Sequence, residues 1–138
     1  MLGTTVTVGG RRTFVVVVHL SPSPRAGLPR QLRLIAEDLN PRRGPVIVGG
    51  DFNALPGYPG LSRFYGGAAG GAGRFVEADE LRAGVPARSG EPTFDVAGRK
   101  IDYVFLCRKW FADPTALSIE TTMSDHRVYI GTARVQRP

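Results

Sequence analysis

The amino-acid sequence predicts a layered α/β sandwich. Three observations support this prediction: apolar β-branched strands, one amphipathic helix between two of them, and a hairpin near the start of the chain. At 138 residues with 42% hydrophobic content, the chain is long enough for one compact core, and no linker composition divides it. We therefore expect a single domain over residues 1–138.

The chain begins with a predicted β-hairpin. Residues 4–8 are all threonine or valine, Gly9 and Gly10 supply the turn, and a β-branched run follows over residues 13–18. Four consecutive valines in that run predict a strand that is buried on both faces. This strand would carry His19 at its C-terminal end.

An amphipathic helix is predicted next. Its apolar residues recur at the i, i+3, i+4 and i+7 spacing, at Leu32, Ile35, Ala36 and Leu39. Pro29 suits the first turn of the helix, and Asn40 followed by Pro41 ends it. A second buried strand over residues 46–48 follows at once, so the helix should cross over between two strands.

The rest of the chain predicts short elements around a glycine-rich surface loop at residues 66–73. Short helices are expected on either side of that loop, near residues 61–65 and 79–82. Strands are expected in the last third of the chain, over residues 100–106, 117–120 and 128–135. A loop through Trp110 and Pro114 would precede the second of these strands.

The net charge favours a polyanionic partner. A formal charge of +6 and a pI of about 10.2 suit nucleic acid, phosphoinositide or an acidic membrane surface. Nearly all the positive charge is arginine, so genome composition explains the bias equally well. No stretch reaches transmembrane length and the chain as given shows no signal-peptide pattern, which leaves cytoplasmic and secreted locations open.

The first candidate site follows the strand at residues 46–48. Asp51 and Asn53 lie two residues apart, so both side chains should project from one side of the chain, with Phe52 turned into the core. The carboxylate can activate a water or hold a hard cation, and the amide can donate hydrogen bonds to developing negative charge. An Asx-type turn is the structural alternative.

Asp125 and His126 form a second polar pair, directly before the last predicted strand. Such a pair can offer one cation ligand and one imidazole that contacts a phosphoryl oxygen or moves a proton. An ordinary polar strand entrance is the alternative.

Two further polar residues are candidates: Asp102, inside the strand predicted over residues 100–106, and His19, at the end of the valine strand. Asp102 stands between apolar neighbours and needs a partner there, and a histidine is a natural partner because a carboxylate fixes its tautomer. A solvent-facing edge position is the alternative. His19 could accompany one of the carboxylates or form a hydrogen bond with nearby backbone.

Taken together, these residues lie in four motifs that occur in order: Val18-His19-Leu20, Gly50-Asp51-Phe52-Asn53, Lys100-Ile101-Asp102-Tyr103 and Ser124-Asp125-His126. With them, and with Thr93-Phe94 ahead of the third, the chain resembles the endonuclease/exonuclease/phosphatase family from its first hairpin to Arg127. The resemblance implies a DNase I-like four-layer α/β/β/α sandwich. This chain would cover roughly the C-terminal half and be truncated at its N-terminus.

The resemblance also implies a hydrolase that cleaves phosphodiester bonds by in-line attack of water, using Mg²⁺ or, alternatively, Mn²⁺. Asp51 would activate the water and help to hold the metal. Asn53 would contact the phosphate and steady the transition state. Asp125 would be a second metal ligand.

The histidines take the remaining implied roles. His126 would contact the scissile phosphate as part of the acid and base machinery, and Asp102 would orient His126. His19 matches a histidine that contacts phosphate and transfers protons in the DNase I-like branch.

The substrate branch, nuclease or phospholipid phosphodiesterase, stays open because specificity in this family lies in variable loops, here residues 21–29 and 54–73. Arg25, Arg63 and Arg74, in or near these loops, are candidate phosphate contacts or ordinary solvated arginines. The basic charge leans slightly toward nucleic acid.

The family's N-terminal half carries an asparagine and a metal-binding glutamate for which this sequence has no matching segment. We therefore expect an exposed sheet face that a dimer or the missing half would cover. The alternative function is a catalytically inactive half-domain that binds phosphate-rich ligands or nucleic acid.

Overall fold

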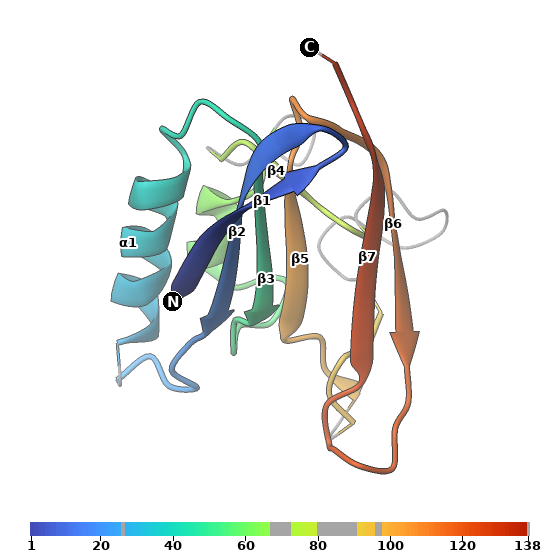
Figure 1. Ribbon diagram of the computed structural model, residues 1–138. Coiled ribbons are helices and arrows are strands. Elements are labelled where there is room, and N and C mark those ends of the chain that lie inside the picture. Colours follow the sequence, from blue (N-terminus) through green and yellow to red (C-terminus); the bar gives the residue numbers. More distant parts are fainter. Residues whose placement is uncertain (26, 67–72, 80–90, 96–97, 138) are drawn as a thin grey trace.

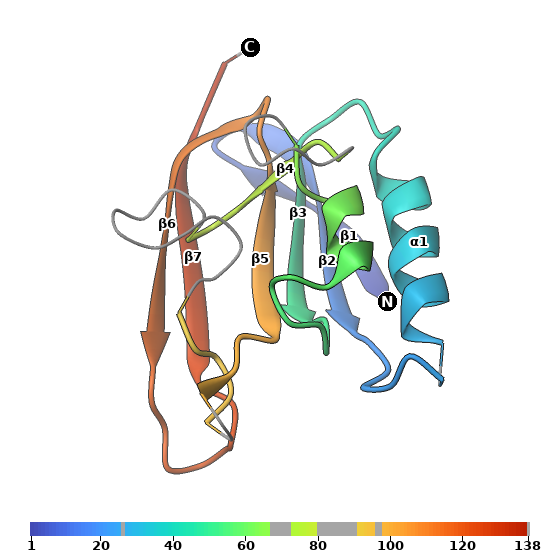
Figure 2. The ribbon, with the colours of Figure 1, turned by 180° about the vertical axis from the view of Figure 1, so that it is seen from behind.

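The computed structural model describes residues 1–25, 27–66, 73–79, 91–95 and 98–137. Its elements in chain order are β1 (Leu2–Val8), β2 (Arg11–His19), α1 (Leu28–Leu39), β3 (Val46–Asp51), the 3₁₀ helix η1 (Pro59–Arg63), β4 (Phe75–Glu77), β5 (Asp102–Cys107), β6 (Phe111–Ile119) and β7 (Val128–Val135). A five-stranded sheet has the order β1-β2-β3-β5-β4, and β6 pairs with β7 in a second sheet. In both views of the molecule, α1 lies at one side and the β6–β7 hairpin at the other (Figure 1, Figure 2).

Local sequence explains the first half of the large sheet. Gly9 and Gly10 both have positive φ, so they close the predicted hairpin and pair β1 antiparallel to β2. The predicted helix then connects β2 to β3, which therefore pair in parallel. β5 returns antiparallel to β3. These predictions of hairpin, helix and strands are confirmed.

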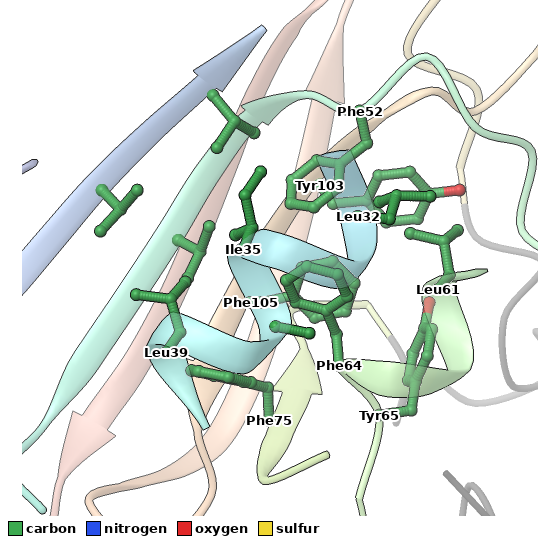
Figure 3. Packing of buried hydrophobic residues seen from close by; sticks show 14 of the residues in the cluster. Leu32, Ile35, Leu39, Phe52, Leu61, Phe64, Tyr65, Phe75, Tyr103 and Phe105 are labelled. Carbon is green, nitrogen blue, oxygen red and sulfur yellow. The ribbon is translucent and has the colours of Figure 1, made fainter. Parts of the chain in front are cut away.

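The core lies between α1, η1 and one face of the large sheet (Figure 3). The helix contributes its apolar stripe, with Leu32 and Leu39 fully buried. Phe52 is also fully buried, and its ring packs edge-on against those of Tyr103 and Phe105. Each such side chain contributes about 1.5–3 kcal/mol of hydrophobic stabilisation.

The prediction that the valine strand is covered on both faces is wrong. Val16 and Val18 face α1 and are buried, whereas Val17 is 58% exposed. The β6–β7 hairpin covers the second face near β5, where Gly131 lies against the Val104 side chain, and it also reaches the β1–β2 turn, where Val135 lies against Gly9. Farther from that turn, no described residue covers the face of β1 and β2 at Leu2 and Val17, which are both exposed.

The predicted loop through Trp110 and Pro114 is also corrected, since β6 begins at Phe111. The register with β7 shifts between Ala112 and Thr115, and Asp113 has a positive φ of 52°. Such a bulge accommodates proline inside a strand. The composition suggested a loop because proline is rare in regular strands.

The middle of the chain was predicted less well. The helix expected at residues 61–65 is a 3₁₀ helix that begins at Pro59, and β4 was not predicted. Most of the predicted glycine-rich loop and of the helix at 79–82 lies outside the described residues. Within the described ranges, no helix is long and apolar enough to cross a lipid bilayer.

Candidate active site

The strand register brings three of the predicted site residues into one row. His19 at the end of β2 pairs with Asp51 at the end of β3, and Asp51 pairs with Asp102 at the start of β5. Cross-strand partners project from the same face of a sheet, so the three side chains share one face. Val17, two residues before His19, lies on that face too, which is therefore the face opposite α1.

Asp51 is held by the turn that follows it. The Asn53 backbone N–H donates to Asp51 Oδ1 at 2.7 Å, and Asn53 Nδ2 donates to Asp51 Oδ2 at 2.9 Å and to the Leu20 carbonyl at 2.8 Å. Asn53 has a left-handed φ of 48°, which asparagine tolerates. The Asx-type turn, which was the structural alternative for Asp51 and Asn53, is therefore present and forms part of the site. Both amide hydrogens of Asn53 are donated inside the protein, so its contact with a phosphate stays a prediction.

Gly50 allows β2 and β3 to approach closely beside the site. Its φ is 132°, and a Cβ atom there would lie 2.0 Å from the Val18 carbonyl oxygen. Only glycine fits this position without a backbone shift.

Asp102 has the histidine partner that its sequence context predicts. His126 Nδ1 lies 3.0 Å from Asp102 Oδ2, and the Ser124 hydroxyl accepts the His126 backbone N–H. The buried Thr93 hydroxyl accepts the backbone N–H groups of Ile101 and Asp102. These contacts bring together two residues that are 24 positions apart in the sequence.

The pKa values of Asp51 and His126 are both raised, but for different reasons. Burial raises the pKa of Asp51 above its ordinary value, and the charge of Asp102 adds to this effect; the Asn53 N–H and both histidines oppose it. For His126, burial would lower the pKa, but the hydrogen bond and charge of Asp102 outweigh it, so the pKa lies above its ordinary value. His19 Nε2 lies 3.5 Å from Asp51 Oδ2, and its side chain is 80% exposed.

The site opens into a pocket of about 930 Å³. Its polar side is lined by five predicted residues: His19, Asp51, Asn53, Asp125 and His126. Asp102 is not among the lining residues, because it lies behind His126 as its hydrogen-bond partner.

The remaining pocket wall comes largely from the two loops expected to carry specificity and from the Thr93-Phe94 motif, whereas Arg99 was not singled out from the sequence. Leu28, Tyr58 and Phe94 form apolar parts of the wall, and Arg99 supplies a cation. Arg25, Arg63 and Arg74 do not line this pocket within the described residues, and Arg74 instead donates to Cys107 Sγ and the Gly44 carbonyl. Local periodicity does not indicate that the wall residues Leu28, Tyr58, Phe94 and Arg99 meet, because α1, the segment before η1 and the loop ahead of β5 bring them together.

The pocket offers only part of a metal site. Asp51 and Asp125 both line it, and a magnesium ion in proteins uses one or two carboxylates together with waters and substrate oxygens. The donor types therefore fit. However, the described residues include no group of three or more His, Cys, Asp or Glu side chains that could hold a metal ion, so these residues alone do not complete the site.

Several solved structures share the fold. The human Nocturnin catalytic domain with bound sulfate matches with a TM-score of 0.64 at 19% identity, over 90% of this chain and 49% of that chain. The Xenopus laevis APE2 catalytic domain matches with a TM-score of 0.60 at 21% identity, over 96% of this chain and 53% of that one. The Bacteroides thetaiotaomicron mannosyl-6-phosphatase Bt3783 matches with a TM-score of 0.59 at 16% identity, over 91% and 52%.

The chain therefore spans about half the length of these structures. A search of curated protein sequences gave no significant match. The profile of the Endonuclease/Exonuclease/phosphatase family, in contrast, matches residues 2–126. The match covers nearly the whole chain and includes all four motifs, and the chain belongs to the endonuclease/exonuclease/phosphatase family with a DNase I-like α/β fold.

Proposed function

We propose that this chain contributes the water-activating and proton-transferring groups of a phosphoesterase site that hydrolyses phosphodiester bonds. The observation that supports the proposal is the row of His19, Asp51 and Asp102 on one sheet face, with His126 bound to Asp102 and facing the same pocket. Family membership supports the same class of reaction.

The charges of the site suit complementary roles. Asp51 has a raised pKa, which makes it a better proton acceptor for an attacking water. His126 also has a raised pKa, so more of it is protonated at neutral pH and can donate a hydrogen bond or a proton to a phosphoryl oxygen. Asp102 stabilises that charged form and fixes the ring orientation. Asn53 holds Asp51, and His19 lies where it can contact the same phosphate.

We propose that Mg²⁺, or Mn²⁺, is required, with Asp51 and Asp125 as protein ligands. When bound, such a cation would offset the charge of the non-bridging phosphate oxygens. Because the described residues contain no three-residue metal group, further ligands would have to come from outside them.

Nucleic acid is the favoured substrate, because the formal charge is +6 and positive charge attracts a polyphosphate backbone. A phospholipid remains the other branch. One relative is a mannosyl-6-phosphatase, so a phosphomonoester belongs in the assay as well.

A second candidate function, a non-catalytic half-domain that binds phosphate-rich ligands, is favoured by the incomplete metal site.

The exposed part of the sheet face is compatible with either function. Leu2 and Val17 are cross-strand partners on the face that carries the site, and they are 78% and 58% exposed. We propose that a second β layer, from a second copy or another half of the domain, covers them. Sedimentation velocity of the isolated chain tests the first source, since a purely monomeric chain would exclude the dimer.

The function is tested by hydrolysis of bis-p-nitrophenyl phosphate, p-nitrophenyl phosphate and plasmid DNA, with magnesium and with EDTA. Asp51→Ala and His126→Ala remove the two reactive groups, and Asp38→Asn removes a carboxylate that pairs with Arg42 on exposed helix surface. The proposal predicts magnesium-dependent turnover that both site variants lose and Asp38→Asn retains.

If the chain alone is inactive, the assay is repeated with a family N-terminal half supplied in trans. Rescued turnover that depends on Asp51 supports the phosphoesterase. No turnover even then, together with retained binding of inorganic phosphate, favours the binding module.

A further inference from the structure

A second group of charged residues lies outside the pocket, where β4 and β5 of the large sheet meet β7. Glu77, Asp79 and Lys100 are each at most 4% exposed, and with Tyr129 they form what we call the buried charge cluster. Lys100 Nζ lies 3.2 Å from Asp79 Oδ2 and 3.6 Å from Glu77 Oε1. None of the four lines the pocket, so the proposed reaction does not use them directly.

The cluster connects β7 to the large sheet. The Tyr129 hydroxyl donates to Glu77 Oε1 at 2.8 Å, and Lys100 Nζ lies 3.9 Å from the centre of the Tyr129 ring. A cation this close to an aromatic face is attracted to it, more strongly where water is excluded.

The same cluster is anchored on β5 and on the residues before it. Glu77 Oε1 accepts the Val104 backbone N–H at 3.2 Å, and Glu77 Oε2 accepts the Asp79 backbone N–H at 3.1 Å. Lys100 itself precedes Asp102 by two residues. One buried network therefore contacts both β5 and β7.

These anchor points lie next to the two members of the hydrogen-bonded pair. Lys100 is two residues from Asp102 on the β5 side, and Tyr129 is three residues from His126 on the β7 side. Buried opposite charges are stable only while they stay close to one another, so the Lys100 ion pairs and the Tyr129–Glu77 hydrogen bond favour one relative position of the segments that carry them. We propose that the buried charge cluster positions His126 against Asp102 by fixing the β6–β7 hairpin on β5.

The cluster has a positioning role, and what that role means for catalysis rests on the proposed function. The experiment that tests the positioning role does not depend on that function. The chain has only two histidines, so imidazole ¹⁵N spectra of the labelled chain are simple, and His19→Gln assigns the His126 signals. At a pH where the ring is neutral, these signals report which nitrogen carries the proton, and the bond to Asp102 holds that proton on Nδ1.

Tyr129→Phe removes one hydroxyl but keeps the ring beside Lys100. We expect the ratio of the Nδ1–H to the Nε2–H tautomer of His126 to fall by up to roughly fivefold, the effect of about one net hydrogen bond. Glu77→Gln keeps acceptors for Tyr129 and Val104 but removes the ionisable carboxyl group beside Lys100, so it should lower the ratio by less. It also carries the test alone if Tyr129→Phe does not fold.

The matched control is Thr132→Val. It removes the hydrogen bond to the Thr115 hydroxyl on the exposed side of the same strand, and it should leave the tautomer ratio unchanged. An unchanged ratio in the cluster variants, with a lower unfolding temperature, would mean that the cluster only stabilises the fold and would overturn the proposal. Because no turnover is measured, a failed hydrolysis assay leaves this test intact.

Discussion

The two faces of the five-stranded sheet differ in what covers them, although the same strands form both. On the α1 face, Val16 and Phe52 are fully buried and pack into a continuous core. On the opposite face, Val17 is largely exposed and Asp51 opens into a pocket. Because side chains alternate along a strand, neighbouring residues experience these two environments in turn. The comparison shows that one face of the sheet supplies the packed core and that the opposite face supplies the candidate site.

Phe52→Ala should show the largest effect. Its ring is fully buried and contacts three aromatic rings, so its removal should cost about 3–5 kcal/mol in the free energy of unfolding. Denaturant unfolding followed by circular dichroism measures this. Leu55→Ala, at a side chain that is 50% exposed, is the control and should change the free energy by less than about 0.5 kcal/mol.

Val16→Ala and Val17→Ala test the comparison within one strand. Val16 is fully buried, so its truncation should cost about 2 kcal/mol, whereas truncation of Val17 should cost under about 0.5 kcal/mol. Equal costs in denaturant unfolding would show that the second face is covered in solution, as a dimer would do. Repeating the measurement at several protein concentrations shows whether a dimer is the cause, because the stability of a dimer depends on protein concentration.

Asp102→Asn should give a smaller change in the free energy of unfolding but a clear change in the pKa of His126. The hydrogen bond and charge of Asp102 raise the pKa of His126, so the variant should lower it, as ¹H NMR titration of the two histidine rings can measure. A raised folded-state pKa stabilises the fold below the unfolded value of about 6.5 and loses that contribution as pH rises through the folded value. Since His126 is 34% exposed, we expect at most about 1 kcal/mol. An unshifted His126 would mean that the pair does not form in solution.

Much of this comparison could be predicted from local patterns. The Gly9-Gly10 turn, the apolar stripe ending at Leu39 and the strand at residues 128–135 all carry a periodicity that short-range geometry fixes. Phe52 was expected in the core for the same reason, and it is there. The need of Asp102 for a histidine partner could also be inferred, because an acidic group among apolar neighbours is costly to bury alone.

What could not be predicted depends on contacts between distant segments. Whether Val17 is buried depends on how far the β6–β7 hairpin extends over the sheet, which the valine run itself does not encode. Glu77, Lys100 and Tyr129 meet only through the pairing of β4 with β5 and the packing of β7. The start of β6 was predicted as a loop because proline is rare in a regular strand, whereas the bulge observed there accepts Pro114.

The central claim is that the sheet face opposite α1 carries groups that bind a phosphoryl group. Its most direct test is a ¹H NMR titration of the two histidine rings with inorganic phosphate, with and without magnesium, in the wild-type chain, in Asp38→Asn and in Asp102→Asn. The account predicts a saturable shift of the His126 signals that Asp38→Asn retains and Asp102→Asn weakens. Unchanged His126 signals up to high phosphate concentration, with magnesium present and the chain folded, would contradict it.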